Sequence, residues 1–285
     1  MKISVVLFKA FTWKRGGGNP AGIVFSESPY PEKVMQSVAR ETGLSETVFI
    51  TPLEEDRFYL RFFTPRQEVP LCGHATIAAW TWLSHEKKLR PGVYSQETKK
   101  GVLAIDITEE GDIFMEQPLP YFGAAVDEKT VALSLSLSPD AFHPAYPVQV
   151  VSTGLPDILV PLASGFFLKE IRPDLNQIED VSREAGAVGY HVFAPEEGEF
   201  QARCRNFAPA VGIKEEAATG TASGALAAYL YRYGPDHKKS YSFIQGESMG
   251  EPSLIRVEIK EEKKRITGVC VGGRAVFSEK CGILI

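Results

Sequence analysis

The sequence predicts an α+β protein of two pseudo-symmetric domains, each a curled β-sheet wrapped around one central apolar helix. Two observations lead to this expectation. Short motifs recur in the same order in the two halves of the chain, and each half contains a helix-length segment without a charged side chain. At 285 residues the chain is also longer than a usual single domain, which favours two domains of similar size.

Three pairs of motifs carry the repeat. VARETG at 38–43 recurs as VSREAG at 181–186, RFFTP at 61–65 recurs as RNFAP at 205–209, and GHATIAAWTWL at 73–83 recurs as GTASGALAAYL at 220–230. The offsets of 143, 144 and 147 residues keep the three pairs collinear, with short insertions between them. Collinearity favours an internal duplication over coincidence, and a repeat of this size decides the fold as a whole.

The expected elements follow the same order in both halves. Runs of β-branched and aromatic residues predict strands at 2–8, 22–25, 47–51 and 58–63 in the first half, and at 148–151, 158–162, 191–194 and 200–205 in the second. A helix at 32–42 begins after Pro31 and stops at Gly43, and its counterpart at 175–185 begins near Asp174 and stops at Gly186.

The apolar segments at 75–84 and 222–230 complete each half. They are rich in residues that favour helix, contain no Pro and carry no charge. Because a helix that is apolar on every side must be buried on every side, each is expected at the centre of its domain. EQPLPYFG at 116–123 is the predicted linker, which gives domains at 1–117 and 118–285; the last ten residues either stay in the second domain or return to the first.

Composition and charge exclude several classes of function. A net charge of −5, without a basic arm, disfavours nucleic acid as a partner, and the short basic run at 263–265 is typical of a solvated strand end. The first residues indicate a strand rather than a signal peptide, and no apolar run reaches membrane-spanning length, so no membrane partner is expected. Four cysteines without a CxxC pair suit a reducing cytoplasm and predict no metal site.

The chemistry is expected at the first turns of the two apolar helices. The first backbone N–H groups of a helix lack intrahelical partners, and glycine there lets a ligand approach closely. If the halves pack with two-fold pseudo-symmetry, these turns face each other and form a cradle for a carboxylate. The alternative is that both glycines only ease tight turns. The predicted binding residues of the two turns are Gly73, Ala75, Gly220, Thr221 and Ala222.

Several motifs resemble those of the PhzF (phenazine biosynthesis-like) family: GGNPAGIV at 17–24, GLSETVF at 43–49, LCGHAT at 71–76, and FAPAVGIKEEAATGTASGAL at 207–226. They span nearly the whole chain in the family's order. The resemblance implies a fold similar to diaminopimelate epimerase, with two α/β domains, a central helix in each and an active site in the cleft between them. It also implies a homodimeric isomerase that needs no cofactor and moves a proton within a small carboxylate-bearing substrate.

Glu46 is the predicted general acid/base, because the resemblance places the family's catalytic carboxylate there. The repeat indicates the same residue independently, since offsets of 143 or 144 place Gly189 or Tyr190 opposite it. A carboxylate in only one copy of a repeated scaffold favours function over packing. An apolar cleft is expected to raise its pKa toward the working pH. The alternative is a surface glutamate that caps a turn with Ser45.

Three further residues are expected to have supporting roles. His74 begins the first apolar helix, where the helix dipole is expected to keep its imidazole neutral for substrate positioning or proton relay, unless it is only a cap. Glu216 stands where the family typically has Asp, with Ala217 in place of Pro, and is expected to polarise or orient the substrate. Asn19 is expected to line the same cleft, although Asn-Pro is foremost a turn signal.

Two alternative functions remain open. Epimerases of similar fold use one cysteine before each central helix, whereas this chain has Cys72 before the first and Thr219 before the second. A threonine hydroxyl is too weak an acid to replace a thiolate, so a two-base racemase that uses Cys72 needs an unrecognised partner. The other alternative is a non-catalytic binding or interaction protein that retains the cleft. The sequence also lacks a GxGxxG dinucleotide loop and a GxSxG hydrolase elbow.

Overall fold

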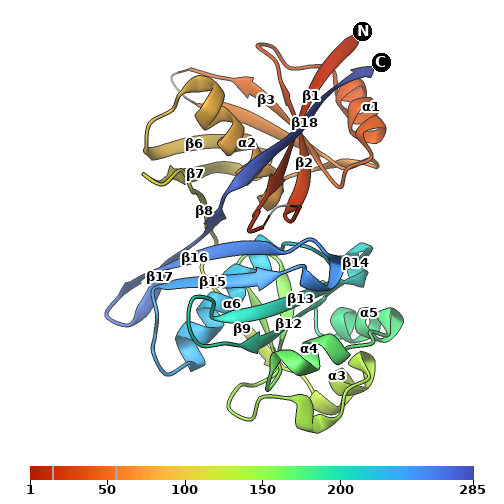
Figure 1. Cartoon of the computed structure of the whole chain (residues 1–285), viewed down its shortest axis with the longest axis vertical. Coiled ribbons are helices and arrows are strands. Elements are labelled where there is room, and N and C mark those ends of the chain that lie inside the picture. The colour runs from red at the N-terminus through yellow and green to blue at the C-terminus, as the bar shows by residue number, and fades with distance from the viewer. Residues whose placement is uncertain (15, 55–56) are drawn as a thin grey trace. The chain divides into compact units, whose positions relative to one another are not determined.

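The computed structural model describes residues 1–14, 16–54 and 57–285, which form two compact units. Unit 1 contains Met1–Glu116 together with Gly272–Ile285, and unit 2 contains Gln117–Val271. The sequence leaves the domain of the last residues open, and the structure places them in unit 1. The reason is visible in Figure 1, where β18 (Ala275–Leu284) lies along β1 (Lys2–Ala10), antiparallel from Lys2 opposite Leu284 to Ala10 opposite Ala275.

Unit 1 is built on a mixed sheet. Its further strands are β2 (Asn19–Phe25), β3 (Thr47–Pro52), β4 (Phe58–Phe63), β5 (Glu68–Val69), β6 (Gly92–Thr98), β7 (Gly101–Ile107) and β8 (Ile113–Gln117). β2 is antiparallel to β1 and parallel to β3, and β3 is antiparallel to β4. β4 then pairs with β5 in antiparallel and with β6 in parallel orientation, and β6, β7 and β8 continue antiparallel.

Two helices cover opposite faces of this sheet. α2 (Gly73–Lys87) contacts β1, β2, β3 and β18, and nine of its fifteen residues are buried, all between His74 and Leu83, as its uncharged segment predicts. Its Trp80 is fully buried, meets Phe58 edge-on at 5.5 Å between ring centroids and donates from Nε1 to Gln96 Oε1 at 2.7 Å. α1 (Glu32–Thr42) packs its apolar side on the other face of the sheet and ends at Gly43 in the left-handed conformation, as predicted.

Unit 2 repeats this arrangement. Its strands are β9 (Tyr121–Ala125), β10 (Gln149–Ser152), β11 (Pro156–Pro161), β12 (Tyr190–Pro195), β13 (Ala202–Ala208), β14 (Ile213–Glu216), β15 (Ser240–Gln245), β16 (Ser253–Glu262) and most of β17 (Arg265–Gly273). Its helices are α3 (Glu128–Leu135), α4 (Gly165–Glu170), α5 (Leu175–Glu184) and α6 (Gly220–Tyr233). α6 is buried along most of its length, like α2.

The two units share the order and direction of their strand pairings. In unit 2, β10 is antiparallel to β11, β11 is parallel to β12, and β12 is antiparallel to β13. β13 then pairs with β14 in antiparallel and with β15 in parallel orientation, and β15 is antiparallel to β16. Each of these pairings has its equivalent in unit 1. The structure is therefore a two-domain α+β fold with a central apolar helix in each unit.

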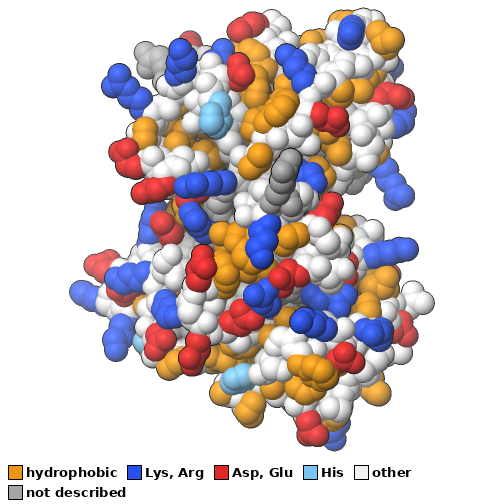
Figure 2. All heavy atoms as spheres, in the orientation of Figure 1, with side chains coloured by type: hydrophobic (Ala, Val, Ile, Leu, Met, Phe, Trp, Pro, Cys, Tyr) orange, Lys and Arg blue, Asp and Glu red, His pale blue; other side chains and the backbone are white. Residues whose placement is uncertain are grey.

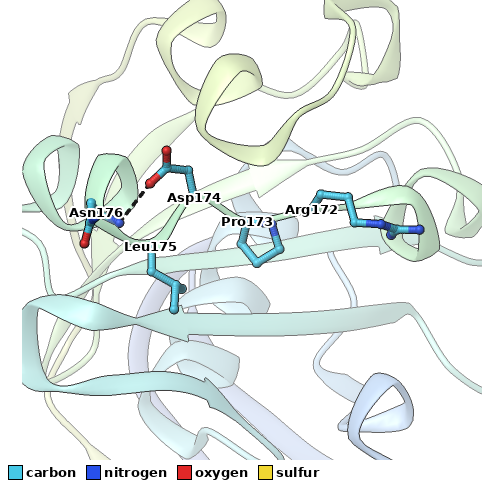
Figure 3. Close-up of a pocket in the computed structure, with 5 residues that line it drawn as sticks. All are labelled: Arg172, Pro173, Asp174, Leu175 and Asn176. Carbon is cyan, nitrogen blue, oxygen red and sulfur yellow. Dashed lines mark hydrogen bonds between the residues drawn. The ribbon is translucent and has the colours of Figure 1, made fainter.

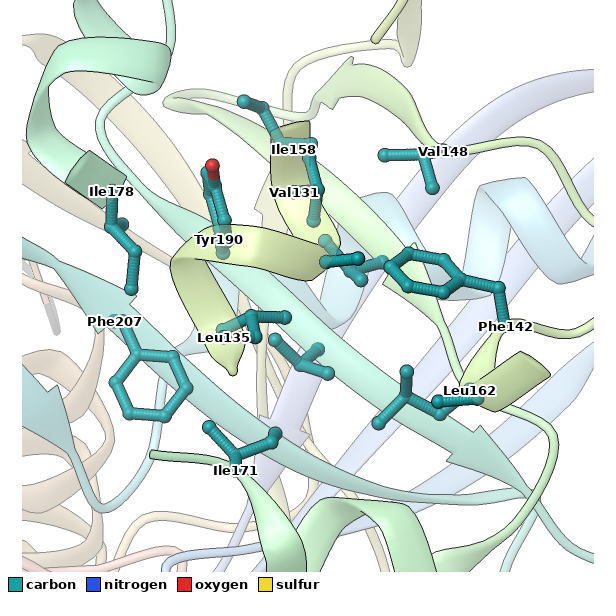
Figure 4. Close-up of a cluster of buried hydrophobic side chains, with 14 of the residues drawn as sticks. Val131, Leu135, Phe142, Val148, Ile158, Leu162, Ile171, Ile178, Tyr190 and Phe207 are labelled. Carbon is teal, nitrogen blue, oxygen red and sulfur yellow. The ribbon is translucent and has the colours of Figure 1, made fainter. Parts of the chain in front are cut away.

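The outer face of the unit 2 sheet carries a second apolar core. Figure 4 shows Tyr190 and Phe207 from the sheet, Val131 and Leu135 from α3 and Ile178 from α5 directed into one space, and all five are fully buried. The opposite face of the sheet packs on α6, where Phe193 meets Tyr229 edge-on at 5.7 Å between ring centroids. Successive residues of β12 and β13 therefore alternate between α6 and the outer core.

Some expected boundaries differ from those observed. The predicted linker at 116–123 overlaps the end of β8 and the start of β9, because only 118–120 lie outside strands. The strand expected at 200–205 runs from Ala202 to Ala208, because its pairing with β12 sets its ends. Both central helices extend beyond their uncharged segments, α2 by two residues before Ala75 and three after Ser84.

Surface features agree with the composition. In Figure 2 acidic and basic side chains alternate over the visible face of each unit. Within the part of the chain that the structure describes, the four cysteines form no disulfide bond with one another. Among the described residues, none of the helices has the length and apolar character needed to cross a bilayer.

Candidate active site

Glu46 lies at the entry to β3, where the chain turns from the end of α1 into the sheet. Its backbone is fixed because its carbonyl oxygen accepts a hydrogen bond from Gly22 N at 3.1 Å. Its side chain is 19% exposed and points toward the first turn of α2. There its Oε2 lies 3.2 Å from Nε2 of His74, which is 6% exposed. The contact is an ion pair by distance, although its alignment falls short of a hydrogen bond.

Three further polar side chains surround the His74 ring. Ser45 Oγ lies 3.4 Å from Nε2, on the side that faces Glu46. Asn19 Nδ2 and Cys72 Sγ each lie 3.4 Å from Nδ1. The structure therefore brings together three predicted residues, Asn19, Glu46 and His74, and adds two neighbours with exchangeable protons.

The pKa shifts in this cluster have identifiable causes. Burial alone would raise the pKa of the Glu46 carboxyl, but the close polar contact and charge of His74, with the nearby Ser45 and Cys72, lower it below its ordinary value. Burial likewise would lower the pKa of His74, but Cys72 and Glu46 raise it well above its ordinary value. Burial, with the nearby charge of Glu46, raises the pKa of the Cys72 thiol above its ordinary value.

These directions overturn two expectations. The sequence predicts a raised pKa for Glu46 and a neutral His74, and both predictions are wrong. They consider the apolar surroundings and the helix dipole separately, whereas the fold places the two groups 3.2 Å apart, where each stabilises the charge of the other. At neutral pH the resting site therefore holds a carboxylate beside an imidazolium.

The same cluster has the composition of a metal site. Glu46, Cys72 and His74 each offer a ligand atom, and these atoms lie within 4.8 Å of one another. The sequence argument against a metal rests on the spacing of the cysteines, whereas the fold places a carboxylate and an imidazole beside Cys72. The direct contact between Glu46 and His74 already pairs two of the three groups.

The first turn of α2 is open for hydrogen bonding. Its N-cap residue, Cys72, makes no side-chain cap hydrogen bond, so Gly73 and Ala75 begin a helix whose first N–H groups are not capped in that way. A Cβ on Gly73 would meet only the end of Met115, at 3.9 Å. Gly73 is therefore not required by crowding within the protein, and its small size leaves room beside the backbone.

In unit 2 the predicted residues gather at the start of α6. The Oε2 atom of Glu216 accepts a hydrogen bond from Thr219 Oγ1 at 2.7 Å. Gln245 holds this turn together, because its Nε2 donates to the Glu216 carbonyl at 2.7 Å and to Thr219 Oγ1 at 3.0 Å, while its Oε1 accepts from Thr219 N. Gly220, Thr221 and Ala222 form the first turn of α6, whose N-cap also lacks a side-chain cap hydrogen bond.

The structure thus collects the predicted residues into two groups, one in each unit. Asn19, Glu46, His74 and the first turn of α2 form the group in unit 1, and Glu216 with the first turn of α6 forms the group in unit 2. The expectation that the two helix ends face each other concerns the relative placement of the units and stays a prediction.

Gly189 occupies the position in unit 2 that Glu46 occupies in unit 1. Glu46 directly precedes β3, which is parallel to β2, and Gly189 directly precedes β12, which is parallel to β11. The carbonyl oxygen of each accepts an equivalent hydrogen bond, from Gly22 N to Glu46 and from Ile158 N to Gly189. A Cβ on Gly189 would lie 1.9 Å from the Phe207 carbonyl oxygen, so no side chain fits there. The carboxylate is therefore present in one unit only.

A hollow on the surface of unit 2 is separate from these residues. Figure 3 shows it lined by consecutive residues around the start of α5, with Asp174 accepting hydrogen bonds from Asn176 N and Gln177 N at 3.1 Å. This hydrogen bonding is an ordinary helix N-cap. None of the predicted site residues lines the hollow, and we assign it no catalytic role.

Sequence reasoning missed several of the observed groups. Ser45 enters only as a possible turn partner of Glu46, and Gln245 is not singled out. Gln245 carries no local signal, because it lies at the end of a strand far from Glu216 in the sequence. Cys72 enters only as the base of the racemase alternative, and not as a neighbour of His74.

The fold and the site together define a class of protein: a two-domain α+β protein with a glutamate–histidine pair at the start of a buried central helix. Within this class, the sequence profile of the phenazine biosynthesis-like (PhzC-PhzF) family matches residues 8–281. The chain belongs to this family, and it is an isomerase of the PhzF type.

Known relatives agree with this assignment. A Bacillus subtilis protein described as an uncharacterized isomerase is 35% identical over 96% of each chain. The trans-2,3-dihydro-3-hydroxyanthranilate isomerase of Pseudomonas fluorescens is 30% identical over 95% of each chain. Among solved structures, a PhzF-family phenazine biosynthesis protein from Bacillus anthracis has 28% identity and a TM-score of 0.90, with both chains fully covered.

Proposed function

We propose that the protein is a cofactor-independent isomerase in which Glu46 moves a proton between two carbons on one face of a small carboxylate-bearing substrate. The observation that carries the proposal is the Glu46–His74 pair in unit 1, together with a glycine in the equivalent position of unit 2 that leaves no space for a second base.

The reaction follows from the charge state of the pair. Glu46 begins as a carboxylate, accepts the proton as a substrate C–H bond breaks, and leaves the bonding electrons delocalised in the substrate. The proton on Glu46 exchanges with solvent during the lifetime of the intermediate. Glu46 then delivers a proton to a second carbon and returns to the carboxylate form, so the net proton count is unchanged. His74 as an imidazolium keeps Glu46 ionised before the transfer, and its positive charge favours the negative charge that develops on the substrate.

Substrate binding is proposed at the two helix starts. The N–H groups of the first turns, with Gly73 and Ala75 in α2 and Gly220, Thr221 and Ala222 in α6, suit a carboxylate because a helix N-terminus favours anions. Asn19 is proposed to contact the substrate beside His74, and Glu216 to orient its polar groups. The similar order of pairings in the two units supports an internal duplication as the origin of these paired starts.

The alternatives are less well supported. A two-base racemase that uses Cys72 needs a reactive thiolate, but burial raises the pKa of this thiol, and the N-cap of α6 is Thr219. A non-catalytic binding protein would not require the paired charges of Glu46 and His74. We further propose that the enzyme acts as a homodimer in the cytoplasm, as the family resemblance implies.

The test uses trans-2,3-dihydro-3-hydroxyanthranilate, the compound named for the Pseudomonas fluorescens relative, as the first substrate, followed by other small unsaturated carboxylates. In deuterated water the product should carry label at one carbon. Glu46→Gln should reduce kcat about 10²- to 10⁴-fold, the usual contribution of general acid/base catalysis. Glu41→Gln, an exposed glutamate in α1, is the matched control and should retain full activity. Undiminished turnover or exchange in Glu46→Gln refutes the assignment.

A further inference from the structure

A row of polar side chains crosses four neighbouring strands of unit 2. It consists of Asp157 in β11, His191 in β12, Asn206 in β13 and Glu216 in β14. His191 pairs directly with Asn206, and Asn206 pairs directly with Glu216. Because directly opposed residues on paired strands point to the same face of a sheet, these three side chains are neighbours. The alternate residues of β11, β12 and β13 belong to the outer core, so the row lies on the face that packs on α6.

The equivalent row in unit 1 is apolar. The same strand pairings identify its members as Ala21, Val48, Phe62 and Val69. The first three are completely buried. Since unit 1 folds with apolar residues at these positions, the scaffold does not require the polar row of unit 2, and the row needs another explanation.

The polar row is costly to bury. Asp157 is 1% exposed, His191 0% and Asn206 1%. The Nδ2 atom of Asn206 donates to Asp157 Oδ1 and to His191 Nδ1, both at 3.3 Å. Among the described residues, Asn206 Oδ1 and His191 Nε2 then have no hydrogen-bond partner. An unsatisfied buried polar group costs about 1–3 kcal/mol, so an arrangement of this kind favours a functional role over a packing role.

The surroundings of Asp157 and His191 also determine the protonation states of these two side chains. Burial raises the pKa of Asp157 to about 7, against a lowering by its hydrogen bond with Asn206, and the negative charge of Glu216 raises it further. Burial lowers the pKa of His191 to about 3, so its ring is neutral. Because Nδ1 of His191 accepts from Asn206, its proton is on Nε2. The adjoining elements add no charge here: β10 has no ionisable side chain, and α6 has no charged residue before Arg232.

We propose that Asp157, with Asn206 and His191, is a positioning residue for Glu216: it holds the single proton that the two carboxyls share, so that Glu216 meets the substrate as a carboxylate. Two carboxyls whose charges influence each other ionise as a pair, and the buried member retains the proton. Asn206 links the two, as the neighbour of Glu216 across the strands and the hydrogen-bond donor to Asp157. This inference rests on the proposed role of Glu216 in the isomerase, but its central claim is measurable without substrate.

The experiment follows the Asp157 carboxyl carbon by NMR in protein labelled with ¹³C at aspartate carboxyls, with Asp157→Asn used to assign the signal. In the wild-type protein the signal should titrate near neutral pH. In Glu216→Gln the midpoint should move to lower pH, because the neighbouring charge is gone. Glu215→Gln is the matched control on the same strand, where the side chain pairs with Arg205 instead, and it should leave the midpoint unmoved. An unmoved midpoint in Glu216→Gln overturns the proposal, as does a wild-type signal that titrates in the ordinary aspartate range.

A second measurement separates this inference from the proposed function. In Asp157→Asn, the inflection that Asp157 contributes near pH 7 should disappear from the pH profile of kcat/KM, while thermal unfolding shows that the protein remains folded. A profile that keeps this inflection contradicts the positioning role. If Glu216→Gln is fully active while the Asp157 midpoint still shifts, the electrostatic coupling between Asp157 and Glu216 is confirmed. The proposed catalytic role of Glu216 is then refuted.

Discussion

The ion pair between Glu46 and His74 yields the sharpest prediction, which is a double-mutant cycle with His74→Gln and Glu46→Gln. At 3.2 Å and an effective dielectric constant of about 20, two unit charges attract by about 5 kcal/mol, which is an upper limit. Solvent reaches Glu46, and each charge also loses hydration on burial, so we expect a coupling of about 1–3 kcal/mol. Each single substitution leaves an uncompensated charge, and the double substitution should cost less than the sum of the two.

The coupling should depend on pH in a defined direction. The pKa of Glu46 is lowered from 4.5, so its contribution to stability is complete above 4.5 and is lost as the pH falls through the lowered value. The pKa of His74 is raised from 6.5, so its contribution is complete below 6.5 and is lost as the pH rises through the raised value. The free energy of unfolding in urea should therefore show the largest coupling near pH 6 and a smaller one at either extreme.

The same substitution should move the activity profile. Without the imidazolium, the pKa of Glu46 rises, so the acid limb of kcat/KM in His74→Gln should shift to higher pH. Glu41→Gln should show neither the coupling nor the shift. Additive unfolding energies at pH 6, or an acid limb that moves to lower pH, refute the claim that His74 is protonated beside an ionised Glu46.

Three further predictions concern the neighbours of this pair. Gly189→Ala places a Cβ against the Phe207 carbonyl and should destabilise the protein by about 3 kcal/mol or more, because the backbone of β13 must shift; thermal unfolding would show this, and an unchanged Tm would contradict the packing described. Cys72→Ser should keep at least a tenth of the wild-type kcat, since the thiol is not the base; loss of all turnover would favour the racemase alternative. Dialysis against a chelator should leave kcat unchanged if the Glu46–Cys72–His74 cluster acts without a metal, and recovery of lost activity on adding zinc would refute that interpretation.

Local signals predicted the fold well where a residue type fixes the backbone. The bounds of α1 follow from Pro31 and Gly43, and the observed helix has the predicted ends. The burial of α2 and α6 follows from their lack of charge. The strand at Ala202–Ala208 was displaced because its ends depend on pairing with a distant strand, which no local pattern encodes.

The site was predictable in its residues but not in its charges. Motif resemblance and the repeat both indicated Glu46, and its contact with His74 agrees with a shared role. The protonation states depend on a 3.2 Å contact between residues 28 positions apart in the sequence, so a residue-by-residue argument gave the wrong direction for both. Asp157 was missed because a single acidic residue near the start of the segment PDILVP looks like an ordinary strand end. Its role becomes visible only when the neighbouring strands and their polar side chains are known.

The two units carry buried polar side chains at different positions of the same scaffold. Unit 1 has a carboxylate before its parallel strand and an apolar row on the helix-facing side of its sheet, whereas unit 2 has a glycine without side-chain space before that strand and a polar row on the equivalent side. Under the proposed mechanism, a single base that both takes and returns a proton needs only one such carboxylate, and a second one would add repulsion at the proposed carboxylate substrate. We propose that this difference between the units separates one-base proton transfer from two-base racemisation. Substitution of a carboxylate for Gly189 should accordingly fail to create a racemase, because Phe207 and Ala208 occupy the space that the new side chain requires.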